Sequence, residues 1–146
     1  MLAELLEIAN SIQDGIVMEA DVVENHSDKK IPILDMKVHI DSDGVAIHEH
    51  FEKPMSTKLV LSARSAHSGA CKRSVHVTEC LRRMQNTSKD ADWDEAVVPV
   101  LNDYMGRMKA AGYREDQRKH VLLNAIAIYN KKVKLEKEQN QTIKLQ

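Results

Sequence analysis

The residues with the clearest chemical potential are basic, and they gather in the middle of the chain. Between residues 53 and 83 there are seven Lys or Arg side chains and one acid, Glu79. The seven are Lys53, Lys58, Arg64, Lys72, Arg73, Arg82 and Arg83. Clustered, flexible cations can bind the phosphate backbone of a nucleic acid in a salt-sensitive and sequence-independent way. The alternative interpretation is a solvated helix face with positive charge, which is the commoner outcome for such a charge run.

The charge of the whole chain is near neutral, which hides this basic middle. The formal net charge at pH 7 is −1, although residues 1–28 hold seven acids and no Lys or Arg. Only five side chains are aromatic, whereas single-strand binders commonly stack bases on aromatic rings. The composition therefore favours binding to a phosphate backbone or a duplex over readout of individual bases.

Patterns that indicate catalysis are absent from the sequence. Two-metal nucleotidyl transfer needs carboxylates that hold both ions, and no Asp-Asp pair occurs. The Gly-x-Ser-x-Gly motif of hydrolases is missing, and Ser65, His67 and Asp35 form no recognisable triad. All five Gly are isolated, so there is no glycine-rich loop to hold a phosphate. The sequence predicts no catalytic residue and no cofactor.

The histidines and cysteines are the candidate metal ligands of the chain. His48 and His50 share one face of an expected strand, a spacing that metal sites use. Zinc needs about four ligands, however, and no Cys pair has ligand spacing. We favour a solvent-facing strand side with scattered His, and no metal site. Cys71, beside two cations, is interpreted as a half-buried structural residue rather than as a reactive thiolate.

The compartment is predicted from the cysteines and from the hydrophobic pattern. Cys71 and Cys80 are nine residues apart on one expected helix, so a disulfide between them is not expected. No apolar run approaches the roughly 18 residues of a membrane span. The first ten residues hold two Glu and no Lys or Arg, unlike a signal peptide. We expect an intracellular protein, cytoplasmic or nuclear, with no membrane partner.

The strongest structural signal lies in residues 30–54. Residues 32–40 alternate apolar and polar side chains, which predicts a strand with one buried face. Asp41-Ser42-Asp43-Gly44 then predicts a tight reversal, and residues 45–51 predict the returning strand. A further alternation over 16–23 predicts a first strand, after an amphipathic helix over 2–13 that ends near Gly15. Residues 1–54 are thus expected to form a helix and a three-stranded antiparallel meander.

The second half of the chain reads as helical. A helix is predicted over 70–84 with Ser68 as N-cap, another over 92–111 with a kink or a later start at Pro99, and a third over 115–137. The expected buried face of the first is Cys71, Val75, Thr78, Leu81 and Met84. The predicted fold class is therefore α+β, with a sheet region over 1–54, a three-helix region over 55–137 and a disordered tail over 138–146.

The hairpin also resembles a known family. The residues Ile31-Pro32-Ile33-Leu34-Asp35, then Asp43-Gly44, then Phe51-Glu52-Lys53-Pro54 are similar to a motif of reverse transcriptases from mobile elements, in particular the Penelope-like group and related animal retroelements. Two positions depart from that pattern, where Ile33 replaces Phe and Glu52 replaces Arg. The resemblance covers roughly residues 1–84.

This resemblance implies a position within a polymerase. The hairpin corresponds to the end of the palm near the primer grip, with Lys53 and Pro54 at its turn, and Lys72 and Arg73 open the thumb helix. The Tyr-x-Asp-Asp motif that precedes these elements in the family is absent. The resemblance therefore implies a non-catalytic piece of an RNA-directed DNA polymerase. This piece would bind template–primer nucleic acid, as an RNA–DNA hybrid or a DNA duplex. A missing palm and fingers portion is a possible protein partner.

Two other classes of function remain open. The helices over 70–84, 92–111 and 115–137 could form a helix-turn-helix DNA-binding module, which predicts sequence preference and a polar recognition helix. Alternatively, the chain could be a structural or protein-interaction remnant, which predicts an exposed apolar patch and self-association.

Overall fold

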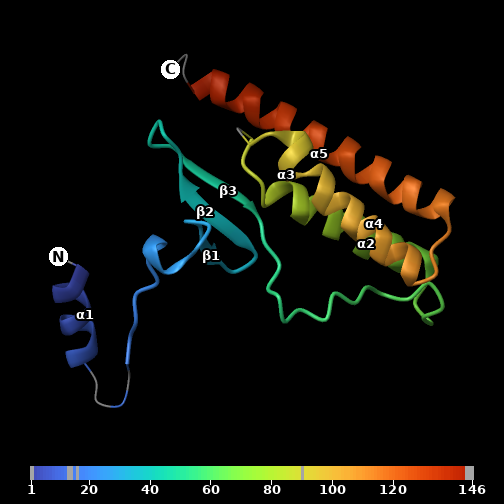
Figure 1. Cartoon of the computed structure of the whole chain (residues 1–146). Coiled ribbons are helices and arrows are strands. Elements are labelled where there is room, and N and C mark those ends of the chain that lie inside the picture. Colours follow the sequence, from blue (N-terminus) through green and yellow to red (C-terminus); the bar gives the residue numbers. More distant parts are fainter. Residues whose placement is uncertain (1, 13–14, 16, 90, 144–146) are drawn as a thin grey trace. The chain divides into compact units, whose positions relative to one another are not determined.

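The chain has the α+β fold that the sequence predicts: an N-terminal helix, a three-stranded antiparallel sheet and then helices (Figure 1). The computed structural model describes residues 2–12, 15, 17–89 and 91–143. The chain divides into two compact units, Met1–Ile31 and Pro32–Gln146. The predicted boundary between residues 54 and 55 falls inside the second unit, because the hairpin and the helices belong together. The elements in order are α1 Leu2–Ser11, the 3-10 helix η1 Val23–Asn25, β1 Ile31–Ile33, β2 Met36–Ile40, β3 Ala46–His50, α2 Gly69–Gln85, α3 Trp93–Ala96, α4 Val98–Ala110 and α5 Glu115–Ile143.

The first unit contains α1 and the segment that follows it. Gly15 has a φ of +85°, the left-handed conformation expected after this helix. The predicted strand over 16–23 is wrong: residues 17–22 belong to no strand, and Val23–Asn25 form η1. Alternation of side chains is not sufficient for a strand, since a strand also needs a neighbour for its backbone hydrogen bonds. Ile16 and the predicted helix end at Gln13 lie outside the described residues.

The sheet has the strand order β1-β2-β3. β2 and β3 pair antiparallel, from Met36 opposite His50 to Ile40 opposite Ala46. The reversal between them lies where the sequence predicts it. The carboxylate of Asp41 accepts hydrogen bonds from the backbone N–H groups of Asp43 at 2.9 Å and Val45 at 2.8 Å, and Gly44 has a φ of +79°. This side-chain-supported turn fixes the register of the hairpin.

The continuous strand predicted over 32–40 is wrong. The chain turns at Leu34 and Asp35, so this stretch contributes to both β1 and β2. Leu34 has a φ of +56° and is mostly exposed. A non-glycine residue in this region costs roughly 1–2 kcal/mol, and nothing in the side-chain alternation signals it. The strand that completes the sheet beside β2 and β3 is therefore β1, residues 31–33, and not the predicted strand over 16–23.

The helix ends follow their capping residues. Ser68 caps α2 by accepting a hydrogen bond from the N–H of Cys71 at 3.2 Å. The helix predicted over 92–111 is divided into α3 and α4 at Val97, with Pro99 in the first turn of α4, because proline cannot donate the backbone bond that an uninterrupted helix needs there. α5 continues to Ile143, so residues 138–143 are helical where a disordered tail is predicted, and 144–146 lie outside the described residues.

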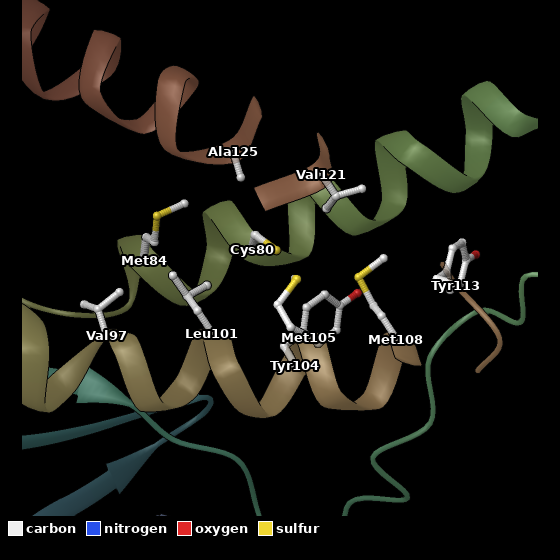
Figure 2. Close-up of a cluster of buried hydrophobic side chains, with 10 residues drawn as sticks. All are labelled: Cys80, Met84, Val97, Leu101, Tyr104, Met105, Met108, Tyr113, Val121 and Ala125. Carbon is white, nitrogen blue, oxygen red and sulfur yellow. The ribbon is translucent and has the colours of Figure 1, made fainter. Parts of the chain in front are cut away.

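The core lies among α2, α4 and α5, and α5 packs against both other helices (Figure 1). Figure 2 shows ten buried hydrophobic side chains that meet there: Cys80, Met84, Val97, Leu101, Tyr104, Met105, Met108, Tyr113, Val121 and Ala125. In the described ranges, no helix combines the length and the apolar character needed to cross a membrane.

The buried face predicted for α2 is mostly wrong. The helix buries His76, Cys80, Arg83 and Met84, whereas Cys71, Val75 and Thr78 are exposed and Leu81 is partly buried. The predicted face was chosen by its apolar residues. The true face includes two polar side chains that are stabilised by partners on distant elements, so the hydrophobic pattern of α2 alone points to the wrong side.

Candidate nucleic-acid interface

A polar network fastens the end of the hairpin to the helices. Arg107 on α4 donates to both carboxylate oxygens of Glu52, at 2.8 and 2.5 Å. Arg82 on α2 forms an ion pair with Asp35, and Asn86 donates to the same carboxylate at 2.8 Å. Burial opposes ionisation of Asp35, but the hydrogen bond from Asn86 and the charge of Arg82 hold its pKa below the usual range. The sheet and the helix bundle are therefore joined by charged contacts.

The two histidines of β3 belong to this network. The N–H of Ser88 donates to the carbonyl of His48 at 2.7 Å, and the N–H of His48 donates to the hydroxyl of Ser88 at 2.7 Å. His48 also lies 3.0 Å through Nδ1 from the carbonyl of Asn86. His50 Nε2 lies 3.1 Å from Nη1 of Arg83. The interpretation of this strand side as solvent-facing is wrong, because it packs on the end of α2.

Arg82 and Arg83 are already engaged within the protein. Arg82 makes two hydrogen bonds to the carboxylate of Glu79, at 2.9 and 2.8 Å, besides its pair with Asp35. Arg83 is only 4% exposed, lies 3.0 Å from Glu79 and stacks over the ring of Tyr104 at 4.8 Å. The sequence places both arginines off the buried face, which is wrong for Arg83. Its guanidinium is not accessible to a phosphate.

The other five predicted cations lie between the end of β3 and the first turns of α2. Lys53, Lys58, Arg64 and Arg73 are exposed. Lys72 is half-buried and donates from Nζ to the carbonyl of Ala63 at 2.8 Å, which holds the ammonium without neutralising its charge. We call residues 53–73 the basic segment. No acidic residue occurs in it, so its positive charge is not balanced locally.

The basic segment has no regular structure before α2, but it is held at one point. The N–H of Ala63 donates to the carbonyl of Ala111 at 3.0 Å, which attaches the segment to the end of α4. Gly112, with a φ of +92°, lies beside Ala63 at that end. The five cations therefore extend along a path from the hairpin to the start of α2, passing the turn between α4 and α5.

Two clefts adjoin this path. The first, of about 650 Å³, lies between the starts of α2 and α5 and includes Lys72 and Arg73 in its wall. The second, of about 550 Å³, is lined by Lys58 together with Arg82, Arg83 and Arg107, but also by Glu52 and Glu79. Because its three arginines are paired with those two acids, the second cleft is less suited to an anion than the first.

Nucleophilic and metal chemistry find little support in the geometry. Burial raises the pKa of Cys80 to about 12, so this thiol stays protonated. Cys71 is exposed rather than half-buried as predicted, and both cysteines are free. Among the residues that the structure describes, no three His, Cys, Asp or Glu side chains stand close enough to hold a metal ion.

Comparisons of the chain with protein-family models, with curated proteins and with solved structures each gave no match. The family to which the hairpin motif is similar therefore stays a proposal. The arguments for function rest on that motif and on the charges and contacts described above.

Proposed function

We propose that this chain is the end of the palm and the thumb of a retroelement reverse transcriptase, without catalysis of its own, and that it binds template–primer nucleic acid. The observation that carries the proposal is the basic segment, in which five cations follow one another along the chain with no acid between residues 53 and 78: Lys53, Lys58, Arg64, Lys72 and Arg73. The order of elements, with a hairpin first and a capped helix after it, agrees with the position that the motif implies.

The pairing of charges narrows the interface to this segment. Two of the seven cations between residues 53 and 83 are paired with acids inside the protein. Arg82 is paired with Glu79 and Asp35, and Arg83 is paired with Glu79. The remaining five form no ion pair with the residues that the structure describes, so their charge is available to an external anion. The two ends of their path are fixed, because Glu52 is bound to Arg107 and Ser68 caps α2. Preorganised cations lose less entropy on binding than cations on a free loop.

The chemistry favours contacts to the phosphate backbone. No Phe, Tyr or Trp lies in the basic segment, so it lacks the rings on which single-strand binders commonly stack bases. Lys and Arg contacts to phosphates position a duplex without reading its sequence. We therefore infer that binding is salt-dependent and similar for different sequences.

The decisive experiment compares two triple variants of the whole chain. In the first, Lys53→Gln, Lys58→Gln and Arg64→Gln remove three exposed cations of the basic segment. In the control, Lys109→Gln, Lys131→Gln and Lys134→Gln remove the same charge from exposed positions on α4 and α5. Fluorescence anisotropy measures binding to a labelled DNA duplex, the matching RNA–DNA hybrid and each single strand over a salt series.

The first variant should lose most of its duplex affinity. For this variant, the slope of log affinity against log salt concentration should become less steep by about 3, because each lost phosphate contact on DNA accounts for about 0.9 of the slope. The slope of the control variant should change by less than the value for one contact. Equal losses in both variants would indicate a diffuse charge effect and contradict the proposed interface.

Two other outcomes would select the alternative functions. Strong preference for one duplex sequence would favour the helix-turn-helix module. Absence of binding at low salt would leave a structural or protein-interaction remnant.

A further inference from the structure

The first cleft has the composition of a site for a single anionic group. It lies between the first turn of α2 and the first turn of α5, and its walls combine Lys72 and Arg73 with His120 and Gln117. The first N–H groups of a helix have no partner within the helix, and the helix dipole favours an anion there. Two helices of 17 and 29 residues begin at this one cleft, so both starts add to the positive charge of the side chains.

The guanidinium of Arg73 lies back toward the start of its own helix. A Cβ on Gly69 would stand 3.5 Å from Nη1 of Arg73. That distance is an ordinary van der Waals contact, and it places the guanidinium beside the entrance of α2. This brings the guanidinium close to the free N–H groups of the first turn, so that one anion can contact both.

Tyr113 supplies an observation that is independent of charge. It is 7% exposed, it lines the cleft, and its hydroxyl has no hydrogen-bond partner in the described part of the chain. In Figure 2 the hydroxyl oxygen points away from the other core side chains. Leaving a buried hydroxyl without an acceptor costs about 1–3 kcal/mol. A hydroxyl in that state, in a wall that also carries two cations, is suited to donate to an anion entering the cleft.

One acid lies in the same wall. Asp116 lines the cleft, but its carboxylate is paired with Arg114 at 2.9 Å, and Arg114 Nε also donates to it at 3.1 Å. The carboxylate is therefore balanced by its own partner. Lys72 and Arg73 remain as the uncompensated charges of the cleft.

We propose that the cleft between the starts of α2 and α5 binds a phosphate group, held by Lys72, Arg73, Tyr113 and the N–H groups that open α2. The group is either a phosphodiester of a nucleic acid or the phosphate of a small molecule. Only the first source rests on the proposed function; the site itself does not.

The test uses inorganic pyrophosphate as the probe and the whole chain labelled with ¹⁵N. Binding is followed by shifts of the backbone N–H signals of Gly69 and Ala70 and of the His120 ring. Tyr113→Phe removes one hydroxyl without changing the packing, and Arg73→Gln removes one exposed charge. Lys119→Gln is the matched control, since Lys119 is an exposed cation beside His120 that does not line the cleft.

The site predicts that Tyr113→Phe and Arg73→Gln each weaken pyrophosphate binding at least about tenfold, as expected for a hydrogen bond to a charged group, while Lys119→Gln leaves it unchanged. Competition then identifies the source. If a DNA duplex or an RNA–DNA hybrid displaces pyrophosphate, the ligand is a phosphodiester. If neither does, it is a small phosphate compound.

Two results would overturn the proposal: no saturable shift at these signals in the unaltered chain, or equal affinity in Tyr113→Phe. The outcome is separable from that of the proposed function. The triple variant of Lys53, Lys58 and Arg64 should lose duplex binding and keep pyrophosphate binding, so each idea can fail without the other.

Discussion

Glu52 and Arg107 are 55 residues apart in sequence and meet in a two-point ion pair, with Nη1 to Oε1 at 2.8 Å and Nη2 to Oε2 at 2.5 Å. The pair attaches the second residue after β3 to the last turn of α4. Hydrogen bonding from Arg107 is the main reason that the pKa of Glu52 falls to about 2. Under the proposed likeness to reverse transcriptases, Glu52 stands at a position that carries Arg there, and its partner on α4 gives this difference a structural role in the present chain.

Substitution of Glu52 by Gln should destabilise the fold by about 2 kcal/mol, because it removes one of the two carboxylates paired with the half-buried guanidinium of Arg107 and leaves only Asp103. The loss should be present above pH 4.5, the ordinary pKa, and should disappear as the pH falls toward 2, where Glu52 itself is protonated. Urea denaturation at several pH values measures it.

A double-mutant cycle with Arg107→Gln isolates the pair, and Arg114→Gln is the control because its pair with Asp116 is exposed. An exposed pair contributes only about 0–1 kcal/mol. A coupling energy near zero between Glu52 and Arg107 would contradict the assigned role.

The titration of His50 predicts a second pH dependence of stability, at higher pH than that of Glu52. Burial and the charges of Arg83 and Arg82 lower its pKa to about 4, against the weaker influence of Glu79 and Asp35. Below pH 6.5 the unfolded state takes up a proton that the folded state does not. Stability should therefore fall between pH 6.5 and 4 and level off below that, as linkage requires.

The measurement is the urea midpoint across that window in the unaltered chain and in His50→Gln. The variant should show a visibly flatter profile between pH 6.5 and 4. Identical profiles would mean that the acid sensitivity of the protein comes from other groups.

Two tyrosines of the core should respond differently to loss of the hydroxyl. The Tyr104 hydroxyl is hydrogen-bonded to Nδ1 of the buried His76 at 2.7 Å, so Tyr104→Phe should cost about 1–2 kcal/mol by leaving that nitrogen unsatisfied. The Tyr113 hydroxyl has no hydrogen-bond partner among the residues that the structure describes, and Tyr113→Phe should be neutral or slightly stabilising. Thermal unfolding followed by circular dichroism compares the two. A larger loss for Tyr113→Phe would mean that its hydroxyl has a partner inside the fold.

A matched pair of glycines separates backbone strain from helix propensity. Gly112 has a φ of +92° and a Cβ there would stand 3.6 Å from Ala63 Cβ, so Gly112→Ala should destabilise by about 1–2 kcal/mol. Gly106 lies inside α4 with open space at its Cβ position, and Gly106→Ala should stabilise by roughly 0.5–1 kcal/mol. Chemical denaturation gives both values. A stabilising Gly112→Ala would show that the turn can adopt another conformation.

Local signals of the sequence predicted the helices and the hairpin turn well. Four residues set a helix end or break through their effect on the neighbouring backbone, namely Ser68, Asp92, Pro99 and Gly112. The Asp41 turn is of the same kind. The left-handed Leu34 gives no such signal, since leucine is not a residue that turns require.

The candidate site was harder to predict, because it depends on pairing across the sequence. Nothing near Arg83 shows that its partners include Tyr104 and Glu52, which follow from the packing of α4 and the hairpin. The cleft required α5 to begin beside α2. The sequence carries a signal for half of the cleft, because charge points to Lys72 and Arg73, whereas Tyr113 and His120 lie outside the basic segment.

The core described above is unusually rich in sulfur: Cys80, Met84, Met105 and Met108 meet in its centre. Met84 and Met108 are fully buried, whereas Met55 is 96% exposed. Oxidation of a methionine needs contact with the oxidant, so Met55 should react directly and the buried pair only through opening of the bundle. Conversion of either buried thioether to a polar sulfoxide would oppose reclosure. The ratio of the two oxidation rates therefore reports the fraction of molecules in which this bundle is open.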